Sequence, residues 1–198
     1  MQDVAKGVVI ITKRGARILS IVALVFTALF SALGLLFALG YAWEDPGGWP
    51  SVLITAAVVL PLGGLTWLVA GAPRAGSWAL QIGTAVYAVW ALLSQFVPLV
   101  EAPVIPVFAL TLAVPTAVLG LREPLRAGLL MLSLAVAPFV CLLIRLARES
   151  GPEGPGLGDL LGTSTGVLVV TLAVLAALIL IAAAFDRHRA TVPQPIAR

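Results

Sequence analysis

The sequence predicts an all-α membrane protein, a bundle of about six transmembrane helices whose N-terminus and C-terminus both lie in the cytoplasm. Three observations predict this class. Of the 198 residues, 61% are hydrophobic and 11% are charged, against roughly 45–50% and about 25% in soluble domains. The mean hydropathy is +1.10. The apolar residues gather in runs long enough for helices that cross about 30 Å of hydrocarbon, and basic residues flank these runs unequally.

The first apolar run, residues 18–42, follows a basic cytoplasmic segment, residues 1–17. At about 25 residues it exceeds the 7–15 apolar residues of a cleaved signal peptide, so we interpret it as a retained crossing. A turn at residues 44–48, with one proline and two glycines, separates it from the second run. That run covers residues 51–70.

Turn-forming residues also separate the later runs. Prolines at 73, 103 and 124 stand in the next three connections, and residues 149–158 form a loop rich in Gly and Pro that we expect to be flexible. The tail, residues 186–198, is basic, contains two prolines and is predicted to be disordered. The single transmembrane domain, residues 18–185, therefore has predicted crossings at residues 18–42, 51–70, 77–97, 104–121, 125–144 and 159–185.

The orientation follows from the basic residues near the ends of the six runs. With the N-terminus inside, ten Lys and Arg residues are cytoplasmic and only Arg145 and Arg148 are outside, whereas six of the nine acids are outside. Five or seven crossings would place a block of Arg residues on the wrong side. Because cytoplasmic loops carry the excess of Lys and Arg, we expect a multi-pass protein of a cytoplasmic membrane. The preference for Arg over Lys, together with abundant Ala, Gly, Leu and Val, indicates a bacterial source.

Residue types that carry catalysis are scarce at membrane depth. The single histidine, His188, lies in the basic tail, so we expect no zinc site and no histidine partner for a serine nucleophile. No pair of acids at depth is available for a dyad or a proton relay. We therefore predict no metal, no cofactor and no enzyme activity. Catalysis at the outer rim by Glu101, Asp159 or Arg145 is the alternative left open.

The formal net charge of +3 does not indicate nucleic-acid binding here. The basic residues flank apolar runs and are explained by membrane topology. The expected partner is the lipid bilayer, with no nucleic acid.

The third run has one polar or small face. At 100° per residue, five polar residues fall within about 140° of arc, opposite a bulky apolar side; they are Gln81, Thr84, Tyr87, Ser94 and Gln95. We expect this face to point into the bundle. Two interpretations stay open: hydrogen bonding and close packing between helices, or the lining of a solute path.

Interior prolines occur in the second, fourth and fifth runs, where each frees a carbonyl and can kink its helix. The candidate hinge comprises Pro61, Gly63, Gly64 and Pro138. If the runs form two groups of three, Pro61 and Pro138 occupy comparable places, as in inverted-repeat transporters. No residue-level repeat accompanies this correspondence.

A row of small residues begins the sixth run. Gly158, Gly162 and Gly166 are spaced four apart and would form a stripe along one helix face, which permits close approach of a second helix. The stripe is expected to pack within the monomer, to mediate self-association, or to contact another membrane protein.

Two functions remain. The first is a non-catalytic membrane subunit or accessory protein, which requires neighbouring side chains to fill the polar face. The alternative is a small-solute transporter, or the substrate-capturing subunit of one. The alternative requires a cavity near the midplane, lined by the polar face of the third run and by Ser133 or Thr111.

Overall fold

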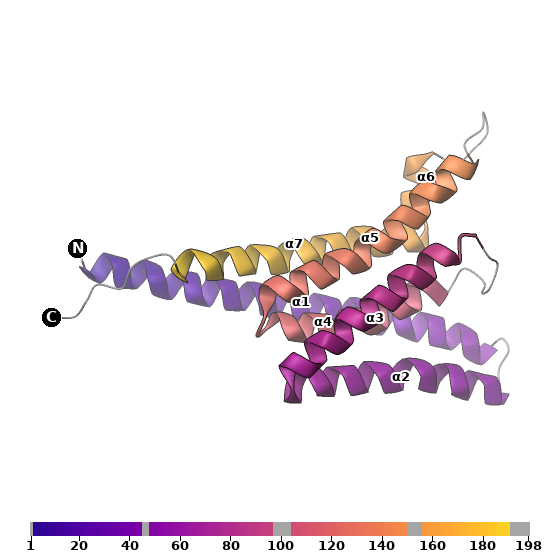
Figure 1. Ribbon diagram of the computed structural model, residues 1–198, viewed down its shortest axis with the longest axis horizontal. Coiled ribbons are helices and arrows are strands. Elements are labelled where there is room, and N and C mark those ends of the chain that lie inside the picture. The colour runs from indigo at the N-terminus through magenta and orange to yellow at the C-terminus, as the bar shows by residue number, and fades with distance from the viewer. Residues whose placement is uncertain (1, 45–47, 97–103, 150–155, 191–198) are drawn as a thin grey trace.

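The chain folds as a bundle of helices. The computed structural model describes residues 2–44, 48–96, 104–149 and 156–190, and all regular structure in these ranges is helical (Figure 1). The predicted turn at 45–47, the connection at 97–103, the loop at 150–155 and the tail at 191–198 lie outside the described residues. The helices are α1 (Gln2–Glu44), α2 (Gly48–Gly71), α3 (Pro73–Leu93), α4 (Val104–Gly120), α5 (Pro124–Glu149), α6 (Leu157–Leu161) and α7 (Ser164–Ala190).

Five of these helices are long and apolar enough to cross a membrane: α1, α2, α3, α5 and α7. The fourth predicted run corresponds to α4, which has 17 residues and is therefore about 25 Å long at 1.5 Å per residue. The all-helical class is confirmed for the described residues.

The outside of the bundle is apolar. Phe37 is 87% exposed, Trp67 78% and Leu60 72%, and large hydrophobic side chains are exposed on all six apolar helices. A soluble monomer rarely exposes apolar patches beyond a few hundred Å². Such a surface is stable against lipid, so the protein is embedded in a membrane.

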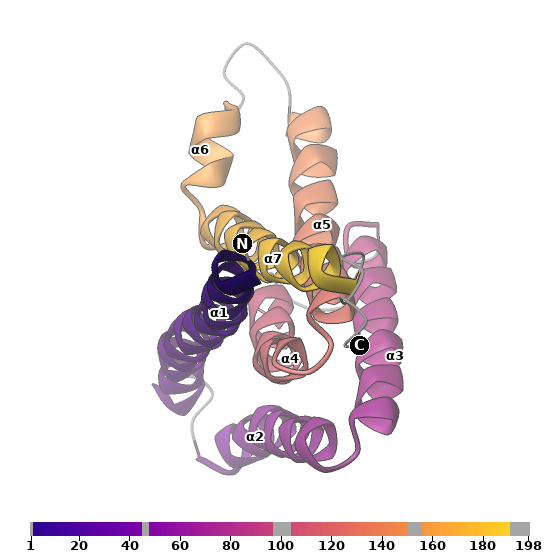
Figure 2. The same ribbon diagram turned by 90° about the vertical axis from the view of Figure 1, so that its left-hand side faces the viewer.

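The central element is α4. It contacts α1, α2, α3, α5 and α7, which surround it when the bundle is viewed along its length (Figure 2). A helix that is apolar on all sides is typical of a bundle core or of a membrane span, and α4 takes the first of these positions. Accordingly, Ala109, Ala113 and Leu119 are fully buried, and Pro115 and Thr116 are less than 2% exposed.

Two glycines set close approaches between neighbouring helices. A Cβ on Gly76 of α3 would lie 2.6 Å from the Cα of Val69 in α2, and a Cβ on Gly128 of α5 would lie 2.6 Å from Leu180 Cδ2 in α7. Both distances are shorter than van der Waals contact. The α2–α3 pair therefore depends on glycine at position 76, where the nearest atom belongs to the backbone, whereas the atoms nearest Gly128 belong to the Leu180 side chain.

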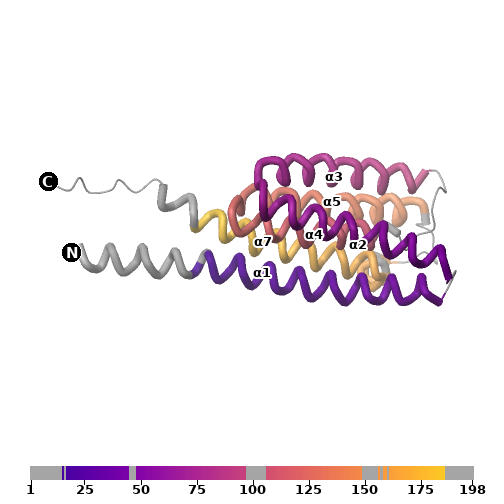
Figure 3. Tube along the Cα trace, turned by 90° about the horizontal axis from the view of Figure 1, so that it is seen from below, coloured from indigo at the N-terminus to yellow at the C-terminus, as the bar shows by residue number. Residues whose placement is uncertain are grey.

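The first and last long helices extend beyond their predicted crossings. α1 begins at Gln2 and α7 continues to Ala190, while the apolar spans within them, Arg17–Glu44 and Ser164–Phe185, agree with the predicted start at residue 18 and end at residue 185. The helices α1 to α5 and α7 run in alternating directions, so α7 ends at the end of the bundle where α1 begins (Figures 1 and 3).

The sixth predicted run is divided. The short α6 ends at Leu161, a turn follows at residues 162 and 163, and α7 begins at Ser164 instead of residue 159. The Gly166 N–H donates to Thr163 Oγ1 at 3.2 Å, and the Thr163 carbonyl accepts from the Val167 N–H at 2.9 Å. Thr163 is thus the N-cap of α7, which explains why this helix starts after the turn.

Candidate functional site

The polar face predicted for the third run is divided between the core and the surface, and its last two residues, Ser94 and Gln95, follow the end of α3. Thr84 and Tyr87 are each 4% exposed, whereas Gln81, Ser94 and Gln95 are partly exposed. The structure therefore brings two of the five residues into the core, among neighbouring helices, and leaves the other three nearer its edge.

The hydroxyls of Thr84 and Tyr87 have no hydrogen-bond partner among the residues that the structure describes. An unpaired buried hydroxyl costs about 1–3 kcal/mol in proteins. Ser94 differs, because its Oγ donates to the Ala91 carbonyl at 2.7 Å, and Gln95 Nε2 donates to Ser94 Oγ at 3.4 Å. The hydroxyls of Thr84 and Tyr87 are thus the buried polar groups of α3 that lack a hydrogen-bond partner in the described part of the chain.

On its α4 side, α3 is closely packed. The rings of Trp90 and Phe108 meet edge to face with centroids 5.4 Å apart, and a Cβ on Gly83 would lie 3.2 Å from Leu112 Cδ2. The contact between these two helices is therefore filled by side chains.

Two contacts between α3 and α5 were not anticipated by the sequence reasoning. Cys141 Sγ donates to the Ala91 carbonyl at 3.3 Å. Arg148 donates to the Gln95 carbonyl, and its guanidinium carbon lies 4.9 Å from the centroid of the Phe96 ring. A cation at the C-terminal end of a helix also interacts favourably with the helix dipole. The only sequence signal for the second contact is that Arg148 lies at the same predicted membrane boundary as the end of the third run.

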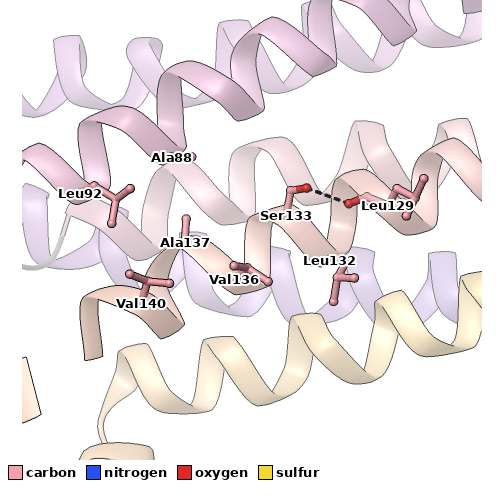
Figure 4. Close-up of a pocket in the computed structure, with 8 residues that line it drawn as sticks. All are labelled: Ala88, Leu92, Leu129, Leu132, Ser133, Val136, Ala137 and Val140. Atoms are coloured by element: carbon pink, nitrogen blue, oxygen red, sulfur yellow. Dashed lines mark hydrogen bonds between the residues drawn. The ribbon is translucent and has the colours of Figure 1, made fainter. Parts of the chain in front are cut away.

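A groove of about 370 Å³ runs between α3 and α5 (Figure 4). Its only polar side chain, Ser133, donates to the Leu129 carbonyl at 3.0 Å. Leu129 and Val136 are about half exposed, so the groove opens on the outer surface of the bundle. The lining residues are Ala88, Leu92, Leu129, Leu132, Ser133, Val136, Ala137 and Val140.

The groove does not combine the residues predicted for a solute cavity. Ser133 lines it, but Gln81, Thr84 and Tyr87 do not. Thr111 is buried in α4 and donates to the Val107 carbonyl at 2.8 Å. The predicted cavity residues are therefore distributed between the core and an outward-facing groove.

The candidate hinge residues lie in two different environments. Pro61, Gly63 and Gly64 are on the exposed side of α2, where a Cβ on either glycine would meet nothing within 4 Å. Pro138 of α5 is less than 2% exposed. The two prolines of the proposed repeat therefore have no common packing.

The predicted glycine stripe does not lie on one helix. Gly158 is in α6, Gly162 in the turn and Gly166 in α7. A Cβ on Gly158 would meet nothing within 4 Å, and one on Gly162 would meet only carbonyl oxygens of α6. A packing role for these glycines stays a prediction, but it cannot use one continuous face.

The structure does not bring together, among the residues it describes, the three side chains considered for catalysis at the outer rim. Asp159 Oδ2 accepts from the Gly156 N–H at 2.9 Å, and Glu101 lies outside the described residues. Within the ranges that the structure covers, no group of three or more His, Cys, Asp and Glu side chains is placed to hold a metal ion.

Comparison with known proteins gives no relative. The chain matches no protein-family model, no curated protein and no solved structure.

Proposed function

We propose that this chain crosses the cytoplasmic membrane of a bacterium six times, with both termini in the cytoplasm, and acts as a non-catalytic membrane subunit or accessory protein. In this role it packs against a partner protein, or against a second copy of itself, and needs no cofactor.

The filled centre of the bundle carries the proposal. A solute path along the bundle axis would need space where α4 lies. Instead, α4 contacts all five surrounding long helices, and Ala109, Ala113 and Ala117, at successive turns of α4, are at most 2% exposed. Small side chains at this spacing let neighbouring helices approach closely. The bundle is therefore suited to packing rather than to conducting a solute through its middle.

The alternating helix directions support six crossings. The α2–α3 and α4–α5 connections lie at the same end of the bundle as the start of α1 (Figure 1). Arg74, in the first turn of α3, and Arg122, in the α4–α5 turn, lie at this end. If α4 crosses, the end that carries these arginines is the cytoplasmic one by the rule for basic residues.

The proposal is tested by native mass spectrometry of the full chain released gently from its own membrane. We expect a second protein, or a second copy, at fixed stoichiometry. A single chain under conditions that preserve a known membrane complex in the same preparation would contradict the proposal.

One observation favours a solute-binding function as a second candidate. The unpartnered hydroxyls of Thr84 and Tyr87 are groups that a polar solute would satisfy, since an unpaired polar group inside a membrane is costly. The variant Tyr87→Phe distinguishes the cases. If no solute binds, thermal stability should rise, because an unpaired hydroxyl is removed. If a solute binds, a reproducible small-molecule adduct of the wild-type chain should be lost.

A further inference from the structure

One face of α5 joins an exposed arginine to the α3–α5 groove. Arg126, Leu129, Ser133, Ala137 and Val140 follow at spacings of three, four, four and three residues, which places them along one side of the helix. The last four line the groove. Arg126 therefore lies one helical turn before Leu129, the groove residue nearest to the start of α5.

The length of the groove matches one leaflet of a bilayer. From Leu129 to Val140 is eleven residues along α5, or about 16 Å at 1.5 Å per residue. Half of a hydrocarbon core of about 30 Å is about 15 Å. A chain that enters beside Arg126 and follows the groove to Val140 would extend about 21 Å along α5, past the middle of the predicted crossing at residues 125–144.

The lining of the groove suits an acyl chain. Seven of its eight side chains are apolar, and the hydroxyl of Ser133 is already bonded to its own helix. No polar group in the groove is left to orient a sugar or an amino acid, which need precisely placed hydrogen-bond partners. Ala88 of α3 and Ala137 of α5 contribute small side chains to this lining (Figure 4).

Arg126 supplies the matching charge at the entrance. Its side chain is 58% exposed, and one guanidinium nitrogen pairs with Glu123 Oε2 at 2.9 Å. A guanidinium carries five N–H donors in a planar fork that fits phosphate oxygens. Donors of Arg126 therefore remain for a phosphate group after one nitrogen has paired with Glu123.

Among the described residues at the opposite end of the groove, Arg148 is already engaged by other groups. Arg148 lies eight residues beyond Val140, about 12 Å further along α5. Its guanidinium already bonds the Gln95 carbonyl and stacks on Phe96. The charged end of the occupant is therefore expected at Arg126.

We propose that the α3–α5 groove binds one acyl chain of an anionic phospholipid, and that Arg126 binds the phosphate of its headgroup. The site is independent of the partner protein proposed above and of which leaflet surrounds the start of α5.

The test uses the purified full chain in detergent, titrated with phosphatidylglycerol or phosphatidylcholine of the same acyl chains and observed by native mass spectrometry. We expect one retained phosphatidylglycerol and weaker binding of phosphatidylcholine. Arg126→Gln should weaken phosphatidylglycerol binding about fivefold, because one charge-assisted contact is lost, and should leave phosphatidylcholine binding unchanged. Arg74→Gln, the same charge change on α3, is the matched control.

A second pair of variants tests the groove itself. Ser133→Phe places a ring in the groove from an exposed position and should weaken binding of both lipids about tenfold. Val170→Phe, on the exposed side of α7, is its control. Lipid-free thermal unfolding of each variant shows whether the bundle is intact, and Ser133→Leu replaces Ser133→Phe if it is not.

Two results would overturn the proposal. One is equal loss of phosphatidylglycerol in Arg126→Gln and Arg74→Gln, which would mean that the anionic lipid responds only to total charge. The other is unchanged lipid binding in an intact Ser133→Phe protein. Neither result bears on whether a partner protein exists.

Discussion

At the scale of single residues, the α2–α3 hairpin depends on the absence of one side chain. A Cβ on Gly76 would lie 2.6 Å from Val69 Cα and 2.9 Å from Val69 N. Backbone atoms cannot move aside as a flexible side chain does, so Gly76→Ala must separate the two helices. Overpacking of this kind costs about 1–3 kcal/mol. We expect a lower thermal unfolding temperature in detergent, by about 2–4 °C per kcal/mol for a chain of this size.

Gly64→Ala in the same hairpin is the matched control. Its Cβ would meet nothing within 4 Å, and alanine is favoured over glycine in a helix by about 0.5–1 kcal/mol. Stability should be unchanged or slightly higher. Equal losses in the two variants would show that the close approach at Gly76 does not set the stability of the hairpin.

Side-chain partners could be predicted only within one helix. A period of 100° per residue identifies the polar side of α3 from the sequence, and Thr84 and Tyr87 on that side are indeed buried. The contacts of Cys141 with Ala91 and of Arg148 with Gln95 join residues 50 and 53 positions apart. Which residues meet at such separations depends on helix packing and rotation, and neither is encoded in the periodicity of a single helix.

At the scale of helices, hydropathy located most elements, and local capping decided where one of them begins. The predicted second, fourth and fifth runs start and end within a few residues of α2, α4 and α5. The sixth run is predicted to start at residue 159, whereas α7 begins at Ser164, because hydropathy does not detect a helix cap inside an apolar run. Thr163, between Gly162 and Gly166, caps α7 with its own oxygen and so separates the helix from α6.

The prolines of α2 and α5 should respond oppositely to replacement. Pro61 is exposed, so Pro61→Ala restores a hydrogen bond to the Ala57 carbonyl and removes little packing. A net hydrogen bond contributes about 1 kcal/mol, and we expect the thermal unfolding temperature to rise accordingly. Pro138 is less than 2% exposed, so Pro138→Ala also leaves a cavity. Lost dispersion contacts around that cavity should exceed the gain from one bond, and stability should fall.

Unfolding of both variants in the same detergent, beside the wild-type chain, gives the comparison. A destabilised Pro61→Ala protein would mean that the ring of Pro61 is packed against something outside the monomer. A stabilised Pro138→Ala protein would show that the packing of the Pro138 ring contributes less than one hydrogen bond.

At the scale of the whole molecule, the sequence predicted a bundle but not its centre. α2 and α4 are both apolar on every side, yet α2 is largely exposed and α4 is enclosed. Lipid and a packed interior are equally apolar solvents for a side chain, so composition does not distinguish a helix that faces lipid from one that faces protein. The short length of α4 is the one sequence feature that differs, and it bears directly on the topology.

Whether α4 crosses the membrane decides the sidedness of everything after it. With 17 residues, α4 spans about 25 Å, less than a hydrocarbon core of about 30 Å. Its enclosure by five longer helices removes the need to match the lipid thickness, since lipid does not surround it. We therefore expect α4 to complete a crossing, with residue 122 in the cytoplasm and residue 159 outside.

Single cysteines in a Cys141→Ala background test this expectation in intact cells treated with a membrane-impermeant maleimide. Asp159→Cys should react, whereas Arg122→Cys should react only after the membrane is opened. If α4 entered and left on one side, the two results would be reversed. Arg74→Cys is the reference, because it precedes α4 and should be cytoplasmic under either topology. Labelling of Arg74→Cys in intact cells would instead show that the whole bundle has the opposite orientation, and would contradict the orientation inferred from the basic residues.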